Sequence, residues 1–303
     1  MRISVDRSKF EGVFSLLLTP FLKSGAVDWK TYERYVDWQL AKRPHGLFAV
    51  CGSSDMKWLT LEERLELARI AVKRAGDVPV AATGNLLPDP ADHRDEVRRM
   101  AETGVAAVVL VPPPGMGTDQ KRLGQHFAVL AEEAGCPVIV YEWPMVQPYL
   151  LDAGIYGELV QQQGLIGIKD TTCTMEGIAA KIEAAPESVV YQANHPFMLD
   201  AIRKGARGIM AISTAANADL VIDFWNSAVA GDAAAVEKHR TLVMLDNVLT
   251  HQGGYNATAK LLANLQGMEM ELVCRNPIVL RDETIKVVEL FHEMVYQIPN
   301  AVK

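Results

Sequence analysis

The sequence predicts an α/β protein, a (β/α)8 or TIM barrel with a C-terminal helical extension. First, short apolar runs alternate along the chain with longer amphipathic stretches. Second, these runs show little polar alternation, as expected of parallel strands buried on both faces. Third, the run-and-helix units follow one another over about 230 residues, near the usual size of this barrel. We therefore expect a catalytic barrel at residues 1–231 and helices packed on it at residues 232–303.

Apolar runs of four to seven residues mark the predicted strands. They are Gly12–Leu18, Gly46–Val50, Val78–Ala82, Ala106–Val111, Val138–Tyr141, Leu165–Lys169, Val189–Gln192 and Arg207–Ile212. An open, doubly wound sheet is the competing arrangement. No G-x-G-x-x-G motif follows the first run, however, and eight evenly spaced units fit a closed barrel better.

The amphipathic stretches carry signals for helix starts. Asp28 precedes a stretch with apolar residues at helical spacing and can serve as its N-cap. Thr60 and Glu63 have the spacing of a capping box. The helices predicted within the barrel are Asp28–Leu40, Thr60–Lys73, Pro90–Glu102, Asp119–Ala134, Ala153–Gln162, Met175–Ala184, Pro196–Lys204 and Asn217–Ala230. The tail has no strand pattern and predicts helices at Ala233–Leu249, Ala257–Leu265 and Arg281–Gln297.

The bulk properties exclude several classes of partner. A net charge of −7 and a pI near 5.6 do not favour binding to nucleic acid or to an anionic membrane surface. No apolar segment approaches the roughly 20 residues that a membrane helix needs. The first residues, 1–7, form no apolar signal core, so we expect a cytoplasmic protein.

Neither a metal site nor a disulfide framework is visible. The cysteines, Cys51, Cys136, Cys173 and Cys274, are far apart, as expected of reduced thiols. No His/Glu cluster has metal-ligand spacing. We therefore expect no metal and no separate cofactor.

Lys169 ends the sixth apolar run. Lysine is strongly hydrated and is rarely placed where a strand meets the core unless its amine is used, although it can also reach solvent from such a place. Burial lowers the pKa of a lysine and gives a nucleophilic amine near neutral pH. Because such an amine can condense with a ketone to form a Schiff base, Lys169 is a candidate catalytic residue.

Active groups of such a barrel lie at the carboxyl ends of its strands. Tyr141 ends the strand before that of Lys169, so the two side chains can converge on one small molecule. A tyrosine hydroxyl can relay the protons that Schiff-base formation requires, although packing is the commoner role of a strand-end tyrosine. The turn Gly52-Ser53-Ser54 offers N–H groups and two hydroxyls to a carboxylate, with an ordinary turn as the alternative. Further strand-end candidates for substrate binding are Thr19, Met210 and Asn194.

Six segments carry a resemblance over nearly the whole chain, from about Gly12 to about Leu280. They are Leu18-Thr19-Pro20-Phe21, Gly52-Ser53-Ser54, Tyr141-x-x-Pro144, Gly167-Ile168-Lys169-Asp170, Gly205-Ala206-Arg207-Gly208-Ile209 and Arg275-Asn276-Pro277. In order and spacing they resemble the dihydrodipicolinate synthase/N-acetylneuraminate lyase family of class I, pyruvate-type aldolases. The resemblance implies that Lys169 forms the Schiff base, that Tyr141 relays protons, and that Ser53 and Ser54 hold a 2-oxo acid carboxylate. It also implies a homotetramer built as a dimer of dimers.

The departures from this family concern the second substrate. Asp55-Met56 stand where the family's turn usually continues with Gly-Glu. Pro113 and Pro114 replace an aromatic pair that includes, in members making dihydrodipicolinate, a tyrosine reaching across the dimer. Val146 stands where those members carry an arginine that grips the second substrate's carboxylate. Losing a bidentate clamp weakens binding of that carboxylate. The departures therefore favour an aldehyde or a sugar-derived acid over the lysine-biosynthetic substrate.

Two residues beside Tyr141 and two after the seventh strand are weaker candidates. Glu142 and Trp143 are expected to shape the pocket. Asn194 and His195 could hydrogen-bond a polyol or a carbonyl, while a helix-start position near solvent is the alternative for His195.

Three further polar residues have less support. Asn85 follows the third strand and has the same standing as His195. His126 and His251 lie on predicted helices and are expected to be surface or packing residues.

The sequence thus predicts a class I lyase, an aldolase or dehydratase, acting on pyruvate or on a 2-oxo acid that releases it. One alternative is a binder of 2-oxo acids that keeps the lysine but has lost the hydroxyl relay. Another is an isomerase or phosphate-binding barrel enzyme, although no glycine-rich phosphate loop follows the seventh and eighth strands.

Overall fold

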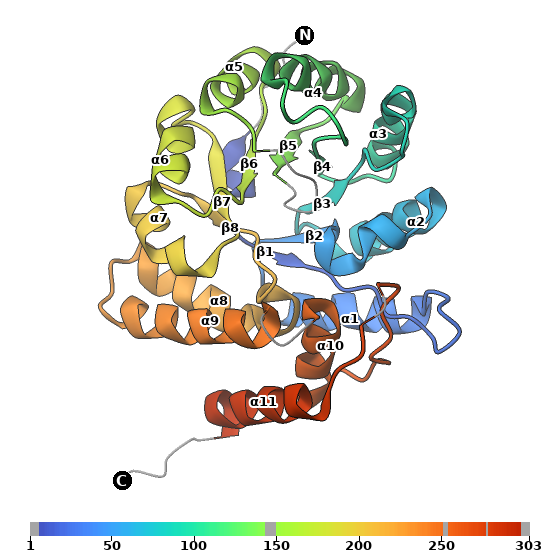
Figure 1. The fold of residues 1–303 in the computed structure, drawn as a ribbon, viewed down its shortest axis with the longest axis vertical. Coiled ribbons are helices and arrows are strands. Elements are labelled where there is room, and N and C mark those ends of the chain that lie inside the picture. The colour runs from blue at the N-terminus through green and yellow to red at the C-terminus, as the bar shows by residue number, and fades with distance from the viewer. Residues whose placement is uncertain (1–5, 143–149, 251–253, 277, 298–303) are drawn as a thin grey trace.

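Eight parallel strands close into a barrel in the order in which they occur along the chain (Figure 1). They are β1 (Gly12–Leu16), β2 (Gly46–Val50), β3 (Val80–Thr83), β4 (Ala107–Leu110), β5 (Val138–Tyr141), β6 (Gly167–Asp170), β7 (Val189–Gln192) and β8 (Gly208–Ile209). The structure is a computed structural model that describes residues 6–142, 150–250, 254–276 and 278–297. The predicted (β/α)8 barrel is confirmed, and the open sheet is excluded because β8 pairs with β1.

A helix follows each strand and covers the outside of the barrel (Figure 1). These helices are α1 (Trp29–Ala41), α2 (Leu61–Ala75), α3 (His93–Ala101), α4 (Gln120–Ala134), α5 (Ala153–Gln163), α6 (Met175–Ala184), α7 (Met198–Lys204) and α8 (Thr214–Val229). Their first turns use the predicted caps: Asp28 accepts the N–H of Thr31, and Thr60 and Glu63 form a capping box. Every strand residue is buried, which explains why the apolar runs do not alternate.

Register on neighbouring strands brings the two leading candidates together. Tyr141 on β5 pairs with Lys169 on β6. Gly167, two residues before the lysine, lies against the carbonyl of Val189 on β7, where a Cβ atom would stand 2.0 Å from that oxygen. A glycine is therefore required for β6 and β7 to approach as they do, and this approach sets the height of Lys169 in the barrel.

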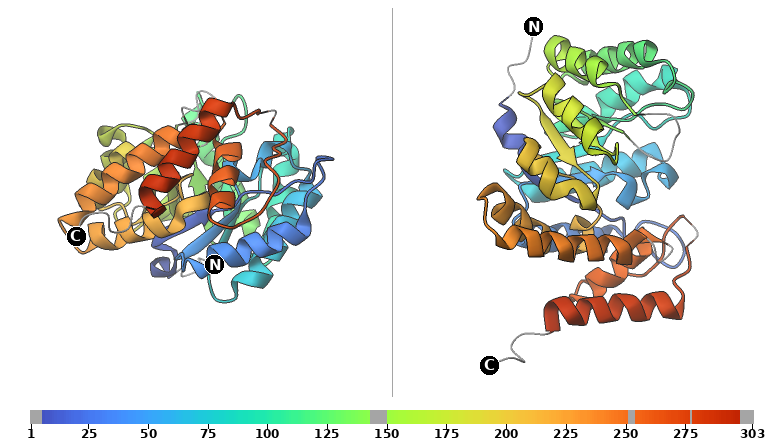
Figure 2. Two further views of the ribbon diagram at one scale, coloured as in Figure 1. Left: turned by 90° about the horizontal axis from the view of Figure 1, so that it is seen from below. Right: turned by 60° about the vertical axis from the view of Figure 1, so that its left-hand side comes forward.

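Three helices follow the barrel: α9 (Ala234–Thr250), α10 (Tyr255–Leu265) and α11 (Asp282–His292), with a π-helical turn at Glu293–Gln297. Both α9 and α10 contact α8, and α10 also contacts the turn at Gly52–Ser54. Figure 2 shows α11 on the outer side of this group, away from the strands. The C-terminal helices are present as predicted, and two of them reach the end of the barrel where the strands finish.

Several strand boundaries differ from the predictions by one to three residues, among them the carboxyl ends of β1 and β8. The first predicted strand continues to Leu18 and the eighth to Ile212, but β1 ends at Leu16 and β8 at Ile209. The eighth strand stops early because the chain already turns into α8, where the N–H and the hydroxyl of Thr214 both donate to the carbonyl of Ala211.

The boundaries of the barrel helices also differ by up to three residues, as at the start of α8. The predicted helix starts at Asn217, whereas α8 starts at Thr214 and contains a kink at Asn217, with φ −121° and ψ 44°. The helical pattern read from the sequence therefore begins at the kink and misses the first turn. Across the described ranges, no helix combines the length and apolar character needed to cross a membrane.

Candidate active site

A cavity of about 200 Å³ opens at the carboxyl ends of the strands. Its lining combines six of the predicted site residues with residues from the helices beyond the barrel. The lining residues are Leu16, Gly52, Ser53, Tyr141, Lys169, Thr171, Ala193, Asn194, Met210, Ile212, Asp246, Thr250 and Tyr255. The predicted location of the site, at the carboxyl ends of the strands, thus coincides with this cavity.

Lys169 lies at the centre of this arrangement. The residue is only 4% exposed, and its Nζ lies 4.0 Å from the ring centre of Tyr141 and 5.5 Å from that of Phe48. Burial lowers the pKa of Lys169 to about 8, with a small opposing contribution from Cys51. At pH 7 about one tenth of such an amine is unprotonated, far more than of an exposed lysine, and this fraction can act as a nucleophile.

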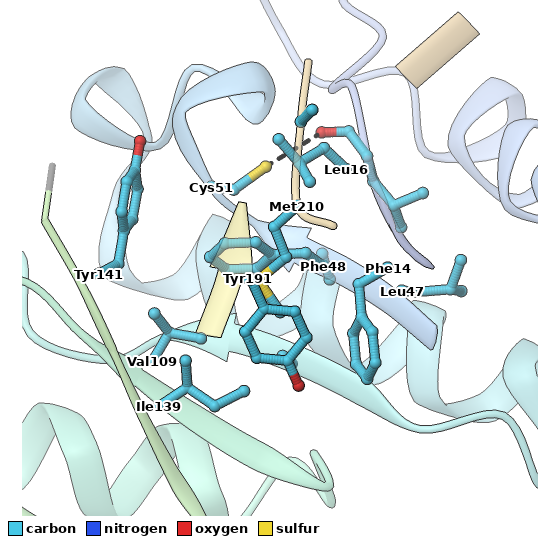
Figure 3. Packing of buried hydrophobic residues seen from close by; sticks show 14 of the residues in the cluster. Phe14, Leu16, Leu47, Phe48, Cys51, Val109, Ile139, Tyr141, Tyr191 and Met210 are labelled. Carbon is cyan, nitrogen blue, oxygen red and sulfur yellow. Dashed lines mark hydrogen bonds between the residues drawn. The ribbon is translucent and has the colours of Figure 1, made fainter. Parts of the chain in front are cut away.

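Tyr141 lies beside the lysine at the edge of the packed barrel interior. Its ring contacts Phe48 edge-on, with the ring centres 6.3 Å apart. In Figure 3 its hydroxyl points away from Val109 and Ile139, toward the side of the barrel where Cys51 lies. A Cβ atom at Gly52 would stand 3.7 Å from the Tyr141 hydroxyl and 3.1 Å from that of Tyr255. Two phenol groups therefore meet at the glycine of the predicted carboxylate-binding turn.

The Gly52-Ser53-Ser54 turn uses its two serines differently. Ser53 lines the cavity. The Ser54 hydroxyl accepts the N–H of Cys51 and donates to its carbonyl, both at 2.8 Å, so it closes the turn upon itself. Thr19 donates to the carbonyl of Ser54 at 2.8 Å. Neither Ser54 nor Thr19 belongs to the cavity lining. These two predicted binding residues therefore stabilise the turn by hydrogen bonds and do not face the cavity.

Glu142 does not line the cavity, contrary to its expected role in shaping the pocket. Strand alternation directs it to the other side of β5 from Tyr141. There its carboxylate lies 2.6 Å from Lys181, which lies 2.7 Å from Asp170. Burial raises the pKa of Glu142, and Lys181 opposes that effect. This buried triad joins the residue after Tyr141 to the residue after Lys169 and so holds their strand ends together.

His195 is buried, so the alternative of a helix-start residue near solvent is wrong. Its Nδ1 lies 2.9 Å from Asp246 Oδ1, and its Nε2 lies 2.7 Å from the Ser213 hydroxyl. Asn194, the preceding residue, lines the cavity. Asn85 is a packing residue, because its amide exchanges two hydrogen bonds of 2.8 Å with the backbone of Val111.

The remaining predicted residues are divided between packing and the undescribed segments. His126 packs against His93, with the two ring nitrogens 3.2 Å apart, and burial lowers its pKa to about 4. Pro113 and Pro114 do not line the cavity. Trp143, Val146 and His251 lie outside the described residues.

Sequence reasoning missed the side of the cavity built by the C-terminal helices. Asp246 and Thr250 come from α9, one turn apart, and Tyr255 begins α10. Nothing local in the sequence marks them, because they lie on amphipathic helices whose arrangement on the barrel is a tertiary property. Within the described ranges, no group of three or more His, Cys, Asp and Glu side chains could hold a metal ion.

The fold and cavity define a (β/α)8-barrel protein with a buried lysine at the carboxyl ends of its strands. The chain belongs to the dihydrodipicolinate synthetase family, whose model matches residues 9–292.

Three similar proteins illustrate this family. A 4-hydroxy-tetrahydrodipicolinate synthase from a Jannaschia species is 28% identical over 280 residues, covering 91% of this chain and 95% of its own. A sialic acid aldolase from Ruminococcus gnavus, solved as a catalytic lysine mutant, superposes with a TM-score of 0.87 at 18% identity, covering 97% of each chain. A prophage protein of the dihydrodipicolinic acid synthase family from E. coli K12, solved with pyruvate, has a TM-score of 0.86 at 19% identity and covers 94% of this chain and 98% of its own.

Proposed function

We propose that this protein is a Schiff-base-forming class I lyase, an aldolase or dehydratase, that acts on pyruvate or on a 2-oxo acid releasing pyruvate. The observation that carries the proposal is the buried amine of Lys169, whose pKa is lowered to about 8 inside a cavity that also holds Tyr141. Lys169 has no carboxylate partner among the described residues, so its burial penalises the charged form and favours the neutral, nucleophilic amine.

The reaction begins when the neutral amine of Lys169 adds to the ketone carbon of pyruvate. The ketone oxygen takes up protons and leaves as water, and an iminium ion forms. Its positive nitrogen accepts the electron pair left behind when a proton departs from C3, which gives an enamine. In the aldol direction C3 then bonds to an aldehyde carbon, and the aldehyde oxygen takes a proton; cleavage is the reverse. Water finally returns the amine and releases the product.

The other cavity residues fit supporting roles in this sequence. In this proposal Ser53 and backbone N–H groups of the turn hold the carboxylate and so orient the ketone beside the amine. In this proposal Tyr141 and Tyr255, whose hydroxyls both lie near Gly52, relay the protons of the carbinolamine and imine steps. Burial raises the pKa of Tyr255, so its hydroxyl stays protonated and available as a hydrogen-bond donor.

The relatives support the same chemistry. The structure of the E. coli family member was solved with pyruvate, and the Ruminococcus aldolase has a lysine that is described as catalytic. Family precedent also leads us to propose a homotetramer, a dimer of dimers, in the cytoplasm. Its mass in solution should be about four times the 33.3 kDa of one chain, as measured by light scattering during size-exclusion chromatography.

Borohydride trapping tests the proposal. The protein is incubated with pyruvate and sodium borohydride, and its intact mass and modified peptide are determined. We expect an added mass of one reduced pyruvate on Lys169 and no addition in Lys169→Ala. Lys204→Ala, which removes a half-exposed lysine at the end of α7, is the matched control and should trap like the wild type. The absence of an adduct with pyruvate and with several longer 2-oxo acids would refute the proposal.

A binder of 2-oxo acids without efficient turnover is the second candidate. The observation in its favour is the pair Pro113 and Pro114, which stand in place of the family's hydroxyl-bearing aromatic segment. Trapping alone is expected of both candidates. Turnover of an aldehyde or a sugar acid after successful trapping would decide for the lyase, and trapping without any turnover would decide for the binder.

A further inference from the structure

Asp246 places a carboxylate in the same cavity as Lys169. It lies on α9, its side chain is 23% exposed, and it lines the cavity together with Thr250 one turn later. The Thr250 hydroxyl donates to the backbone carbonyl of Asp246 at 2.7 Å. The acid is therefore a fixed part of the cavity wall that the C-terminal helices contribute.

A buried chain of hydrogen-bonding groups holds this carboxylate in place. Ser213, directly after the eighth strand region, bonds His195 Nε2 at 2.7 Å, and His195 Nδ1 bonds Asp246 Oδ1 at 2.9 Å. The backbone carbonyl of His195 in turn bonds His239 Nε2 at 2.7 Å. Both Ser213 and His195 are almost fully buried. Neither is a member of the cavity lining, so their role toward a ligand is to orient Asp246.

Asn194 supplies an unused donor in the lining of the same cavity. It immediately precedes His195 and lines the cavity, and its Nδ2 is buried without a hydrogen-bond partner among the described residues. A buried donor without a partner is costly, and a ligand that accepts its hydrogen bond removes the cost. A hydroxyl group both accepts and donates hydrogen bonds, so its chemistry suits the donor of Asn194 and the acceptor of Asp246.

The charges of the cavity disfavour a second carboxylate on the substrate. Among the described lining residues, Lys169 and Asp246 are the only Lys, Arg, Asp or Glu side chains. Lys169 is consumed by the ketone, and Asp246 repels another anion. In the described part of the chain, no arginine or second lysine lines the cavity to pair with a carboxylate on the partner molecule.

We propose that Asp246 and Asn194, with Asp246 held by His195 and Ser213, form a subsite for a hydroxyl group of the non-pyruvate partner. The subsite selects neutral hydroxylated aldehydes over aldehydes that bear a carboxylate. This inference rests on the proposed Schiff-base function, because Lys169 must first form the enamine to which the aldehyde is added.

The test separates the two half-reactions. Trapping of pyruvate by borohydride reports Lys169 alone, while addition of pyruvate to an aldehyde reports both halves. The aldehydes are glyceraldehyde, propanal as its hydroxyl-free counterpart, and succinic semialdehyde as the carboxylated one. The variants are Asp246→Ala and the isosteric Asp246→Asn, with Glu237→Gln as control because it neutralises an exposed acid on the same helix.

In the wild type we expect kcat/KM for glyceraldehyde to exceed that for propanal about tenfold or more, the usual effect of a hydrogen bond to a charged group. Asp246→Ala should bring the two values close together, and Asp246→Asn should lie between it and the wild type. Trapping of pyruvate should stay at the wild-type rate in Glu237→Gln and should not be lost in either Asp246 variant, because Asp246 binds the partner aldehyde and not pyruvate.

Three results would contradict the proposed subsite. They are an unchanged preference in both Asp246 variants, a wild-type preference for succinic semialdehyde, and trapping of pyruvate without addition to any of these aldehydes. If wild-type protein fails to trap pyruvate, the proposed function itself has failed. A loss of trapping in the Asp246 variants alone would show that Asp246 serves the first half-reaction, which also contradicts the proposal.

Discussion

At the scale of single residues, the buried amine of Lys169 sets a pH dependence. Its pKa of about 8 means that the fraction of neutral amine rises as the pH increases through 8, whereas an exposed lysine stays charged until about pH 10. We predict that the initial rate of pyruvate trapping increases about tenfold per pH unit below pH 7 and levels off near pH 9. Initial rates by mass spectrometry at several pH values check this. A rate still rising tenfold between pH 9 and 10 would show that burial does not lower the pKa as described.

The meeting of two phenols at Gly52 gives a second prediction at this scale. Tyr141→Phe should slow trapping about a hundredfold or more, since it removes a general acid–base group. Tyr255→Phe should slow it less, about tenfold, and the double variant should lose less than the product because the two hydroxyls act on the same protons. Tyr156→Phe is the control, as that buried hydroxyl bonds Ser188 outside the cavity lining. Equal rates for Tyr255→Phe and Tyr156→Phe would remove Tyr255 from the relay.

At the scale of helices and strands, the part of the site that strands build could be predicted from the sequence. A parallel strand ends at a known edge of the barrel, so the positions of Lys169 and Tyr141 at the ends of adjacent apolar runs were enough to place them together. Even there, alternation was needed to separate residues that face the cavity from those behind it. Glu142 and Ser54 are neighbours of cavity residues in the sequence, yet both side chains lie outside the cavity lining. Glu142 pairs with Lys181, and Ser54 bonds the backbone of Cys51.

The other half of the site could not be predicted, and the reason is physical. Asp246 and Tyr255 lie on amphipathic helices, whose periodicity indicates a buried face but not which element covers it. Only the packing of α9 and α10 on α8 brings these two residues over the barrel. The solvent-facing alternative for His195 is wrong for the same reason, because α9 packs against the segment that begins at His195.

The buried triad behind the strand ends gives a third prediction. Lys181→Met leaves Glu142 and Asp170 as two unpaired carboxylates in a buried site. We expect the free energy of unfolding to fall by about 3–5 kcal/mol, as is usual when one partner of a buried ion pair is removed. Urea unfolding of this variant and of Lys204→Met, which removes an exposed pair with Glu183, measures the difference. A loss no larger than that of Lys204→Met would mean that water reaches the triad.

At the scale of the whole molecule, the tail completes the cavity only because it is tied to the barrel. Asn256 on α10 donates to Asp55, which follows the Gly52–Ser54 turn, at 2.7 Å. Lys260 is fully buried, with its Nζ 4.8 Å from the ring centre of Phe21. These contacts fix α10, and with it Tyr255, against the first two strand ends. The extension is therefore part of the candidate site and not a separate appendage.

Arg275 makes more hydrogen bonds between the C-terminal extension and the barrel than Asn256 or Lys260 does, and it is the subject of the last prediction. Its guanidinium forms a two-pronged pair with Glu63, each prong 2.6 Å, and donates to the carbonyls of Gly25 and Trp58. We expect Arg275→Met to lower the free energy of unfolding by about 1–3 kcal/mol, the range for hydrogen bonds to charged groups. It should also slow pyruvate trapping, because Tyr255 is held less firmly. Arg281→Met, which removes an exposed arginine, is the control.

Acid should narrow the difference in stability between Arg275→Met and the wild type. The hydrogen bonds from Arg275 lower the pKa of Glu63, so this pair stabilises the folded state above the unfolded pKa of glutamate and loses its effect as the pH falls through the folded value. Thermal unfolding at pH 7 should therefore separate Arg275→Met from Arg281→Met, and unfolding in strong acid should separate them less. A separation that persists unchanged in acid would mean that Arg275 acts through the carbonyls of Gly25 and Trp58, and that its pair with Glu63 contributes little to holding the tail on the barrel.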